Sequence, residues 1–245
     1  MTLPRVLIVK TGSTHPRLVR SDGDYDAWFM AGLERGAERC DVRPAEQELP
    51  DPRAWGGVIL TGSPASVRDG APWMERLGRW TLDAAVQGVP VLAVCFGHQL
   101  VGEALGGRVE RNPQGPERGT VEVTLTEAGR HDPLFAGLPA RILVQQTHED
   151  ALVAPPPADR ATLLATNETC AWQAFAAGPF LRAVQFHPEM GAETMRRLIE
   201  ARGYEGEARP SDHGPRVLRN WDERFVRRAA ELRPARAGEA RARRP

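Results

Sequence analysis

The residue with the clearest chemical signature is Cys95, which ends an apolar run. Residues 89–94 read Val-Pro-Val-Leu-Ala-Val, a run without polar alternation that is typical of a strand buried on both faces of a parallel sheet. Residues 99–105 carry apolar side chains at helical spacing, which predicts a helix. Cys95 is therefore expected on a tight turn from strand to helix, the device that exposes the nucleophile of many hydrolases. The helix dipole favours a thiolate there, and the backbone N–H of Phe96 is available to an oxyanion.

A second motif, far along the chain, supplies the groups that a cysteine nucleophile needs. The short apolar run of residues 183–186 ends at His187, which is followed by Pro188 and Glu189. Cysteine catalysis requires a base beside the sulfur and a third group that orients the base. We expect His187 to take the thiol proton of Cys95 and Glu189 to hold the imidazole ring. Taken singly, the first motif fits an inert core cysteine and the second fits a simple turn, so the prediction rests on their combination.

Together the two motifs resemble those of class I (triad type) glutamine amidotransferases. The resemblance rests on residues 95–99 (Cys-Phe-Gly-His-Gln) and 186–189 (Phe-His-Pro-Glu), and it extends over about residues 5–200. Within the family, the chain is similar to stand-alone proteins related to the amidotransferase domain of GMP synthetase. Further matching pieces are residues 61–67, 119–123 and 147–150. One departure is Ala93, because the residue two before the nucleophile is usually glycine in this family; alanine is the smallest alternative at a crowded turn.

The resemblance implies a glutaminase that releases ammonia from the side chain of L-glutamine through a γ-glutamyl thioester on Cys95. It also implies that a backbone N–H near Gly62 is the second oxyanion donor, that Gln99 contacts the substrate, and that His148 borders the substrate pocket. A plain turn at Gly62 and a surface loop at His148 are the alternatives. His98 is expected to be structural. The chain shows no ATP-binding loop and no second domain-sized segment, so any ammonia acceptor is expected on a separate synthetase subunit.

Two other functions remain open. The same triad could cleave γ-glutamyl peptides such as glutathione, as in related γ-glutamyl peptidases whose cysteine motif also reads Cys-Phe-Gly-His-Gln. The chain could instead be a non-catalytic binding module, a reading that Ala93 favours and that intact Cys95, His187 and Glu189 oppose.

The motifs require an α/β fold that positions them. Residues 6–9 predict a buried first strand, and residues 25–40 and 72–87 predict helices. Short segments without intervening helices (118–126, 141–147, 161–165 and 171–175) predict antiparallel strands in the second half. We expect an open, mostly parallel, flavodoxin-like sheet flanked by helices. Residues 1–203 are predicted as the amidotransferase-like domain. Residues 204–245 are predicted as a polar extension, with a packed helix over 217–232 and a disordered, arginine-rich end over 234–245.

Composition excludes several classes of function. Lys+Arg and Asp+Glu both number 32, so no global field gathers nucleic acid or an anionic membrane. The six histidines are scattered, without the spacing of a metal site, and neither metal nor cofactor is expected. The three cysteines suit a reducing compartment better than a disulfide framework. With neither a signal peptide nor a membrane span apparent, the protein is expected in the cytoplasm.

Overall fold

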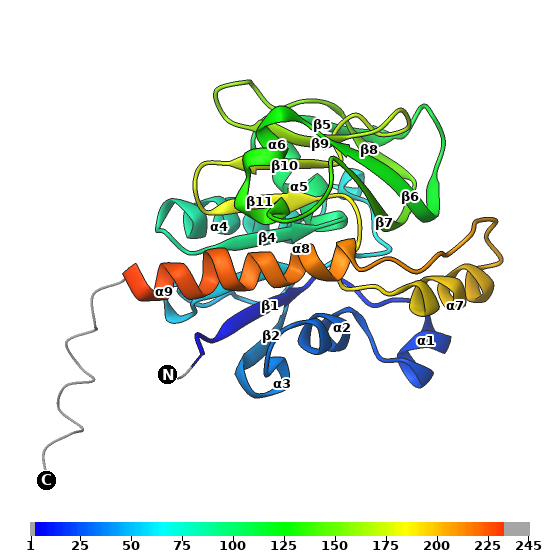
Figure 1. Cartoon of the computed structure of the whole chain (residues 1–245). Helices are drawn as coiled ribbons and strands as arrows, with labels where there is room; N and C mark the ends of the chain where they lie inside the picture. The colour runs from blue at the N-terminus through cyan, green and yellow to red at the C-terminus, as the bar shows by residue number, and fades with distance from the viewer. Residues whose placement is uncertain (1–2, 233–245) are drawn as a thin grey trace, which may run out of the picture.

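A computed structural model describes residues 3–232 and has a nine-stranded mixed sheet at its centre (Figure 1). Five neighbouring strands run parallel, in the order β2 (Cys40–Pro44), β1 (Val6–Lys10), β3 (Gly57–Leu60), β4 (Val91–Val94) and β11 (Leu181–Val184). Four antiparallel strands continue the sheet, in the order β10 (Ala174–Ala177), β9 (Thr162–Thr166), β6 (Glu117–Leu125) and β7 (Arg141–His148). A separate antiparallel pair consists of β5 (Arg108–Arg111) and β8 (Asp150–Ala154). This arrangement confirms the predicted α/β fold with antiparallel strands in its second half.

Helices cover both faces of the sheet. The α-helices are α1 (Pro16–Ser21), α2 (Tyr25–Gly32), α3 (Gly36–Arg39), α4 (Pro72–Val86), α5 (Phe96–Ala104), α6 (Glu127–His131), α7 (Ala192–Arg202), α8 (His213–Trp221) and α9 (Arg228–Leu232). Short 3₁₀ turns lie at η1 (Pro52–Ala54), η2 (Val67–Asp69) and η3 (Pro133–Phe135), and a π-helical segment, η4 (Asp222–Arg227), joins α8 to α9. Within residues 3–232, no helix combines the length and the apolar character needed to cross a membrane.

Strand β1 shows why the central strands are apolar throughout. Its side chains alternate between the two faces of the sheet. Val6 and Ile8 belong to the core shared with α2 and α8, whereas Leu7 and Val9 belong to the core shared with α4 and α5. All four side chains are fully buried. A strand that is covered on both faces buries all of its side chains. Its residues are therefore continuously apolar and do not alternate with polar ones.

The prediction of one helix over residues 25–40 was wrong. The helix ends at Gly32, and α3 begins at Gly36 after Arg35 adopts a left-handed conformation with φ of 52°. A Cβ on Gly36 would lie 2.1 Å from the carbonyl oxygen of Met30. The chain therefore turns back tightly onto the preceding helix at a position that requires glycine. The helical spacing of apolar residues continues through this turn, so the sequence pattern did not predict that the helix ends at Gly32.

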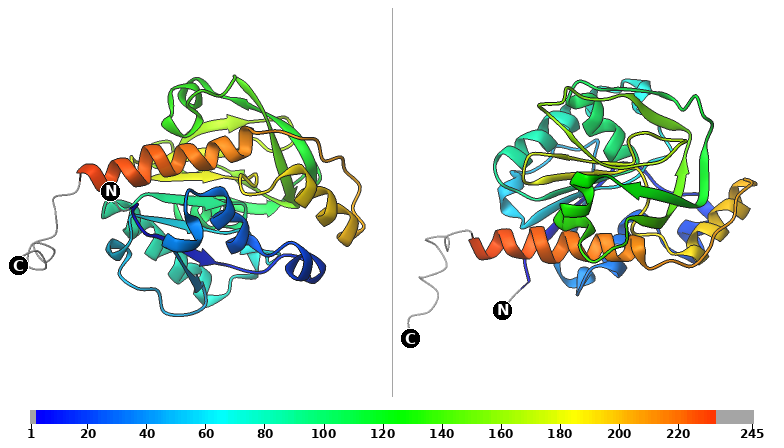
Figure 2. Two further views of the ribbon diagram at one scale, coloured as in Figure 1. Left: turned by 60° about the horizontal axis from the view of Figure 1, so that its bottom comes forward. Right: turned by 45° about the horizontal axis from the view of Figure 1, so that its top comes forward.

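The segment after α7 packs against the rest of the chain. Residues 213–232 form a continuous helical rod that lies across the sheet between its N-terminal and antiparallel halves (Figure 2). Its side chains Val217, Leu218 and Trp221 are fully buried in the core with α2 and the sheet. The division into two domains after residue 203 stays a prediction, and the predicted disorder of residues 234–245 lies outside the described residues.

Candidate active site

Cys95 lies on the turn between β4 and α5, as its sequence context predicts. Its backbone has φ of 51° and ψ of −100°, a conformation that non-glycine residues rarely adopt. Such strain persists where the surrounding structure enforces it, and it is common at nucleophile turns. The loops that follow β3, β4 and β11 meet at the carboxyl edge of the parallel strands, where open α/β sheets place their ligands. They bring Gly62, Cys95 and His187 together.

The crowding of this turn explains the residues around Cys95. A Cβ on Gly97 would lie 2.8 Å from the Cβ of Leu60, so α5 can approach β3 only with glycine at this position. The same Cβ would lie 3.5 Å from the Cβ of Ala93, an ordinary van der Waals contact. Ala93 is fully buried and pairs in register with Leu60 and Ala183. Alanine two residues before the cysteine therefore fits this turn.

His187 forms the expected pair with Glu189. Its Nδ1 lies 2.7 Å from Oε1 of Glu189, and both side chains are almost completely buried. Burial opposes the charged imidazole, but the charges of Glu189 and Cys95 outweigh it and raise the pKa of His187 to about 10. Within residues 3–232, Nε2 of His187 has no hydrogen-bond partner. The ring is therefore oriented through one nitrogen, while the other is available for proton transfer.

Tyr25 packs on His187, a contact that sequence reasoning missed. Its ring lies 5.9 Å from that of His187 with an interplanar angle of 13°. Tyr25 is the first residue of α2, and its backbone N–H donates to Asp24, whose carboxylate also pairs with Lys10 at 2.8 Å. Burial and the charge of Cys95 raise the pKa of Tyr25. No motif in the sequence distinguishes Tyr25 from the other core aromatic residues of this segment.

Two backbone regions offer candidate oxyanion donors. Phe96 is the first residue of α5, so its N–H has no partner inside the helix. Gly62 lies directly against the catalytic pair, because a Cβ there would be 2.8 Å from Cε1 of His187 and 3.6 Å from the Cβ of Cys95. The Gly62 carbonyl accepts from the Thr11 hydroxyl at 2.9 Å. In a trans peptide this leaves the N–H of Ser63 pointing the opposite way, and Ser63 lines the same cavity as Cys95. Ser63 is thus an additional candidate donor.

His148 borders the cavity, but its two ring nitrogens are occupied. Nδ1 lies 2.9 Å from the carbonyl oxygen of Asp150, so it carries a hydrogen and donates. Nε2 lies 2.9 Å from Oε2 of Glu117. The Glu117 carboxylate also accepts from Gln173 at 2.7 Å and from Asn167 at 2.6 Å. Both ring nitrogens of His148 therefore already have a hydrogen-bond partner, and the carboxylate that faces Nε2 is held in place by two amide donors.

The same cluster is the one candidate for a metal site among the described residues. Ligand atoms of Glu117, His148 and Cys170 lie within 4.8 Å of one another, and all three residues are buried. The facing atoms, Nε2 of His148 and Oε2 of Glu117, already bond to each other. A metal would have to displace this hydrogen bond. The donor arrangement therefore fits a proton-bearing pair better than an ion.

The remaining predicted residues lie beside these groups. Gln99 is 4% exposed and lines the cavity; its Nε2 donates to the Asp150 carbonyl at 2.7 Å and to Gln185 at 3.1 Å. Its amide thus holds the chain segment that carries His148, and substrate contact by Gln99 stays a prediction.

His98 is fully buried against Phe175; burial and the charge of His148 lower its pKa to about 3. A neutral, packed imidazole agrees with the expected structural role of His98.

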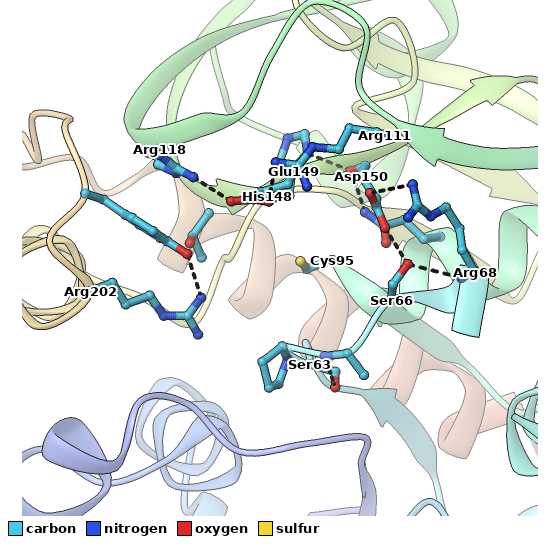
Figure 3. A pocket seen from close by; sticks show the side chains of 15 residues that line it. Ser63, Ser66, Arg68, Cys95, Arg111, Arg118, His148, Glu149, Asp150 and Arg202 are labelled. Carbon is cyan, nitrogen blue, oxygen red and sulfur yellow. Dashed lines mark hydrogen bonds and ion pairs between the residues drawn. The ribbon is translucent and has the colours of Figure 1, made fainter. Parts of the chain in front are cut away.

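Cys95 opens into a cavity of about 260 Å³ with strongly charged walls (Figure 3). The side chains of Ser66, Arg68 and Asp150 lie on one side, and those of Arg118 and Arg202 lie on the other. Tyr204 also lines the cavity, and its hydroxyl lies 3.4 Å from the guanidinium of Arg202. Ser66 donates to Asp150 at 2.5 Å, whereas Arg118 pairs with Glu149 at 2.5 Å. Ser66 and Asp150 lie within the matching pieces 61–67 and 147–150. The arginines and Tyr204 carried no recognisable signal, because scattered arginines resemble an ordinary solvated surface.

Comparisons with known proteins agree with this geometry. Residues 29–204 match the sequence model described as glutamine amidotransferase class-I. A GMP synthase of Thermomicrobium roseum is 39% identical over 146 residues, which are 58% of this chain and 25% of that protein. The chain thus spans about a quarter of the length of this relative.

Two further proteins match over most of their length. Gamma-glutamyl peptidase 3 of Arabidopsis thaliana is 26% identical over 185 residues, or 73% of this chain and 74% of that one. The crystal structure of a glutamine amido transferase from Methylobacillus flagellatus superposes with a TM-score of 0.69, at 25% identity, over 96% of this chain and 98% of the other.

Proposed function

The chain belongs to the class-I glutamine amidotransferase family, and from this premise we propose that it hydrolyses the side-chain amide of L-glutamine through a thioester on Cys95. The observation that carries the proposal is the arrangement at the turn after β4. A strained cysteine there lies with Gly62 against a buried histidine whose Nδ1 is held by Glu189. This is the set of nucleophile, base and orienting group that acyl transfer requires.

The reaction follows from the protonation state of His187. Its raised pKa means that near neutral pH the imidazole holds a proton beside Cys95, whose reactive form is the thiolate. The sulfur attacks the amide carbon; a C–S bond forms, and the carbonyl electrons move onto oxygen, where the N–H of Phe96 and that of Gly62 or Ser63 would stabilise them. Collapse breaks the C–N bond, and His187 gives its proton to the departing nitrogen. Water then attacks the thioester, passes one proton to His187 and releases glutamate and the thiolate.

The destination of the ammonia is part of the proposal. The relative from Thermomicrobium roseum is named as a glutamine-hydrolysing GMP synthase and is about four times as long as the matched region. By analogy, a synthetase subunit that binds in trans would receive ammonia from this chain.

Hydrolysis of γ-glutamyl peptides is the second candidate, because an observation favours it. A similar protein is named as a gamma-glutamyl peptidase, and the cavity around Cys95 carries more arginines than the single carboxylate of glutamine requires. Both candidates use the same Cys95 chemistry and differ only in the leaving group.

The test is glutamate release from L-glutamine by the purified chain, with glutathione in a parallel reaction. We expect release by the wild type and its loss, by at least about 10³-fold, in Cys95→Ala, since a methyl group cannot form the thioester. Cys170→Ala, which removes another buried cysteine, is the matched control and should retain activity. Undiminished activity of Cys95→Ala would refute the mechanism. Failure of an electrophilic glutamine analogue to label Cys95 would favour a non-catalytic binding module.

A further inference from the structure

The arginines that line the cavity differ in whether a carboxylate lies against them. Four arginines line the cavity. Three of them face carboxylates: Arg111 and Arg118 lie 2.8 and 2.5 Å from Glu149, and Arg68 lies 3.6 Å from Asp150.

Among residues 3–232, Arg202 has no carboxylate partner, and its contacts are with Tyr204. Its closest polar contact is the hydroxyl of Tyr204, at 3.4 Å. The cavity therefore holds more positive than negative charge, and the excess lies on the side of Arg202.

The unpaired cation lies close to the reacting residues. Burial and the charge of Cys95 raise the pKa of Tyr25, and the charge of Arg202 acts in the opposite direction on the same group. Arg202 thus reaches the electrostatic environment of the catalytic pair. Its guanidinium lies 5.7 Å from the centre of the Tyr204 ring, whose other contact is the guanidinium of Arg118 at 3.7 Å. The aromatic ring fixes both cations at the wall of the cavity.

The position of Arg202 at the end of a helix does not fully explain how its side chain is arranged. It is the last residue of α7, where a cation interacts favourably with the helix dipole. That role is satisfied by any basic side chain in the last turn that points into solvent. It does not explain why the guanidinium turns toward Tyr204 and into the cavity, on the side of Cys95 opposite Arg68 and Asp150 (Figure 3).

The two sides of the cavity match the two ends of one class of substrate. The α-ammonium and α-carboxylate of a γ-glutamyl group need both signs of charge, which Asp150 and Arg68 provide. Glutamine has no further charge beyond its reacting amide, so it would leave the side of Arg202 without a partner. A γ-glutamyl peptide carries a second carboxylate on the leaving amino acid, beyond the bond that Cys95 attacks.

We propose that Arg202, with Arg118 and Tyr204, forms a subsite for the carboxylate of an anionic leaving group, so that the preferred substrates are γ-glutamyl amino acids or peptides. The inference rests on the proposed Cys95-dependent hydrolysis and specifies its substrate class. The leaving amine accepts the proton of His187, as ammonia would, and departs as a free amino acid or peptide. Its carboxylate stays paired with Arg202 until release.

The experiment compares two amides that differ only in this carboxylate: γ-glutamylglycine and γ-glutamylethylamide. The measured quantity is the ratio of their kcat/KM values. We expect the wild type to prefer γ-glutamylglycine by about tenfold or more, the size of one charge-assisted contact, and Arg202→Met to lose that preference. Arg202→Lys, which keeps the charge, should restore part of it. Arg196→Met on the solvent side of the same helix, where Arg196 pairs with Glu193 at 2.5 Å, is the matched control and should keep the wild-type ratio.

Each outcome decides between the two proposals. Hydrolysis of both amides with a ratio near one, or a ratio that Arg202→Met leaves unchanged, overturns the subsite while Cys95-dependent hydrolysis stands. If neither of these amides is hydrolysed while L-glutamine is, the subsite is overturned and the proposed function stands; if L-glutamine is not hydrolysed either, the proposed function fails. The subsite is then judged by calorimetry on the Cys95→Ala protein: tighter binding of γ-glutamylglycine than of γ-glutamylethylamide, lost in the Arg202→Met double variant, supports it, and equal binding refutes it.

Discussion

His187 and His148 both lie against a buried carboxylate, and the comparison separates the pair that we propose to be catalytic from a structural pair. His187 is 2.7 Å from Glu189, and His148 is 2.9 Å from Glu117. A carboxylate partner therefore does not identify the base. The difference lies in the second nitrogen: within the described chain that of His187 is unpartnered, whereas that of His148 is bonded to the carbonyl of Asp150. A histidine can transfer protons only through a nitrogen that the fold leaves available.

The largest expected effect comes from removing each histidine in turn. His187→Gln should lower kcat/KM for the best substrate by about 10²- to 10⁴-fold, because general acid–base catalysis is lost. His148→Gln should lower it far less, since a glutamine amide can still donate to Glu117. Steady-state kinetics on both variants measures the contrast. Equal losses would mean that the occupied nitrogens of His148 do not exclude it from proton transfer.

Removing the charge of Glu189 should have the next largest effect. Glu189→Gln takes away a group that raises the pKa of His187. We expect kcat/KM to fall by about 10²-fold and the alkaline limb of its pH profile to move to lower pH, because the imidazolium loses its proton earlier. The pH–rate profile is the measurement. An alkaline limb that stays at the wild-type position would show that Glu189 orients the ring without setting its charge.

The corresponding change in the other pair should affect stability more than chemistry. Glu117→Gln replaces the buried carboxylate that bonds His148, Asn167 and Gln173, and we expect unfolding to become easier by about 1–3 kcal/mol because buried polar groups lose their partners. Urea denaturation measures the change. Glu122→Gln is the control, because Glu122 is an exposed residue of the same strand. A stability equal to the wild type in both variants would remove the structural role assigned to Glu117.

The smallest effect concerns the pH dependence of stability. The folded pKa of His187, about 10, is above its ordinary value of 6.5, so the folded protein binds more protons than the unfolded chain between these values. The resulting stabilisation is fully present below pH 6.5 and is lost as the pH rises toward 10. The advantage in unfolding free energy of the wild type over His187→Gln should therefore shrink from pH 7 to pH 10. Exposed His131→Gln is the control; a gap that widens with pH would contradict the raised pKa.

Sequence reasoning predicted the catalytic segments because their signals are local. An apolar run that ends at Cys95 before glycine, and a second run that ends at His187, each specify a strand and the turn after it. Parallel strands present their carboxyl ends on one edge, so the turns had to meet there. The helical break at Arg35 was missed for the opposite reason, since the turn depends on the close approach of Gly36 to Met30, which periodicity does not record.

The sequence by itself determined the fold class, the strand-to-helix turn at Cys95 and the pairing of His187 with Glu189, because neighbouring residues encode all three. Only the tertiary structure decided which histidine keeps a ring nitrogen available for proton transfer and which side chains line the cavity around the sulfur of Cys95. Glu117 reaches His148 across 31 positions, and Asp150 reaches Arg68 across a still longer stretch of chain. Such contacts depend on which strands and loops become neighbours, a property of the folded sheet that no local pattern of side chains carries.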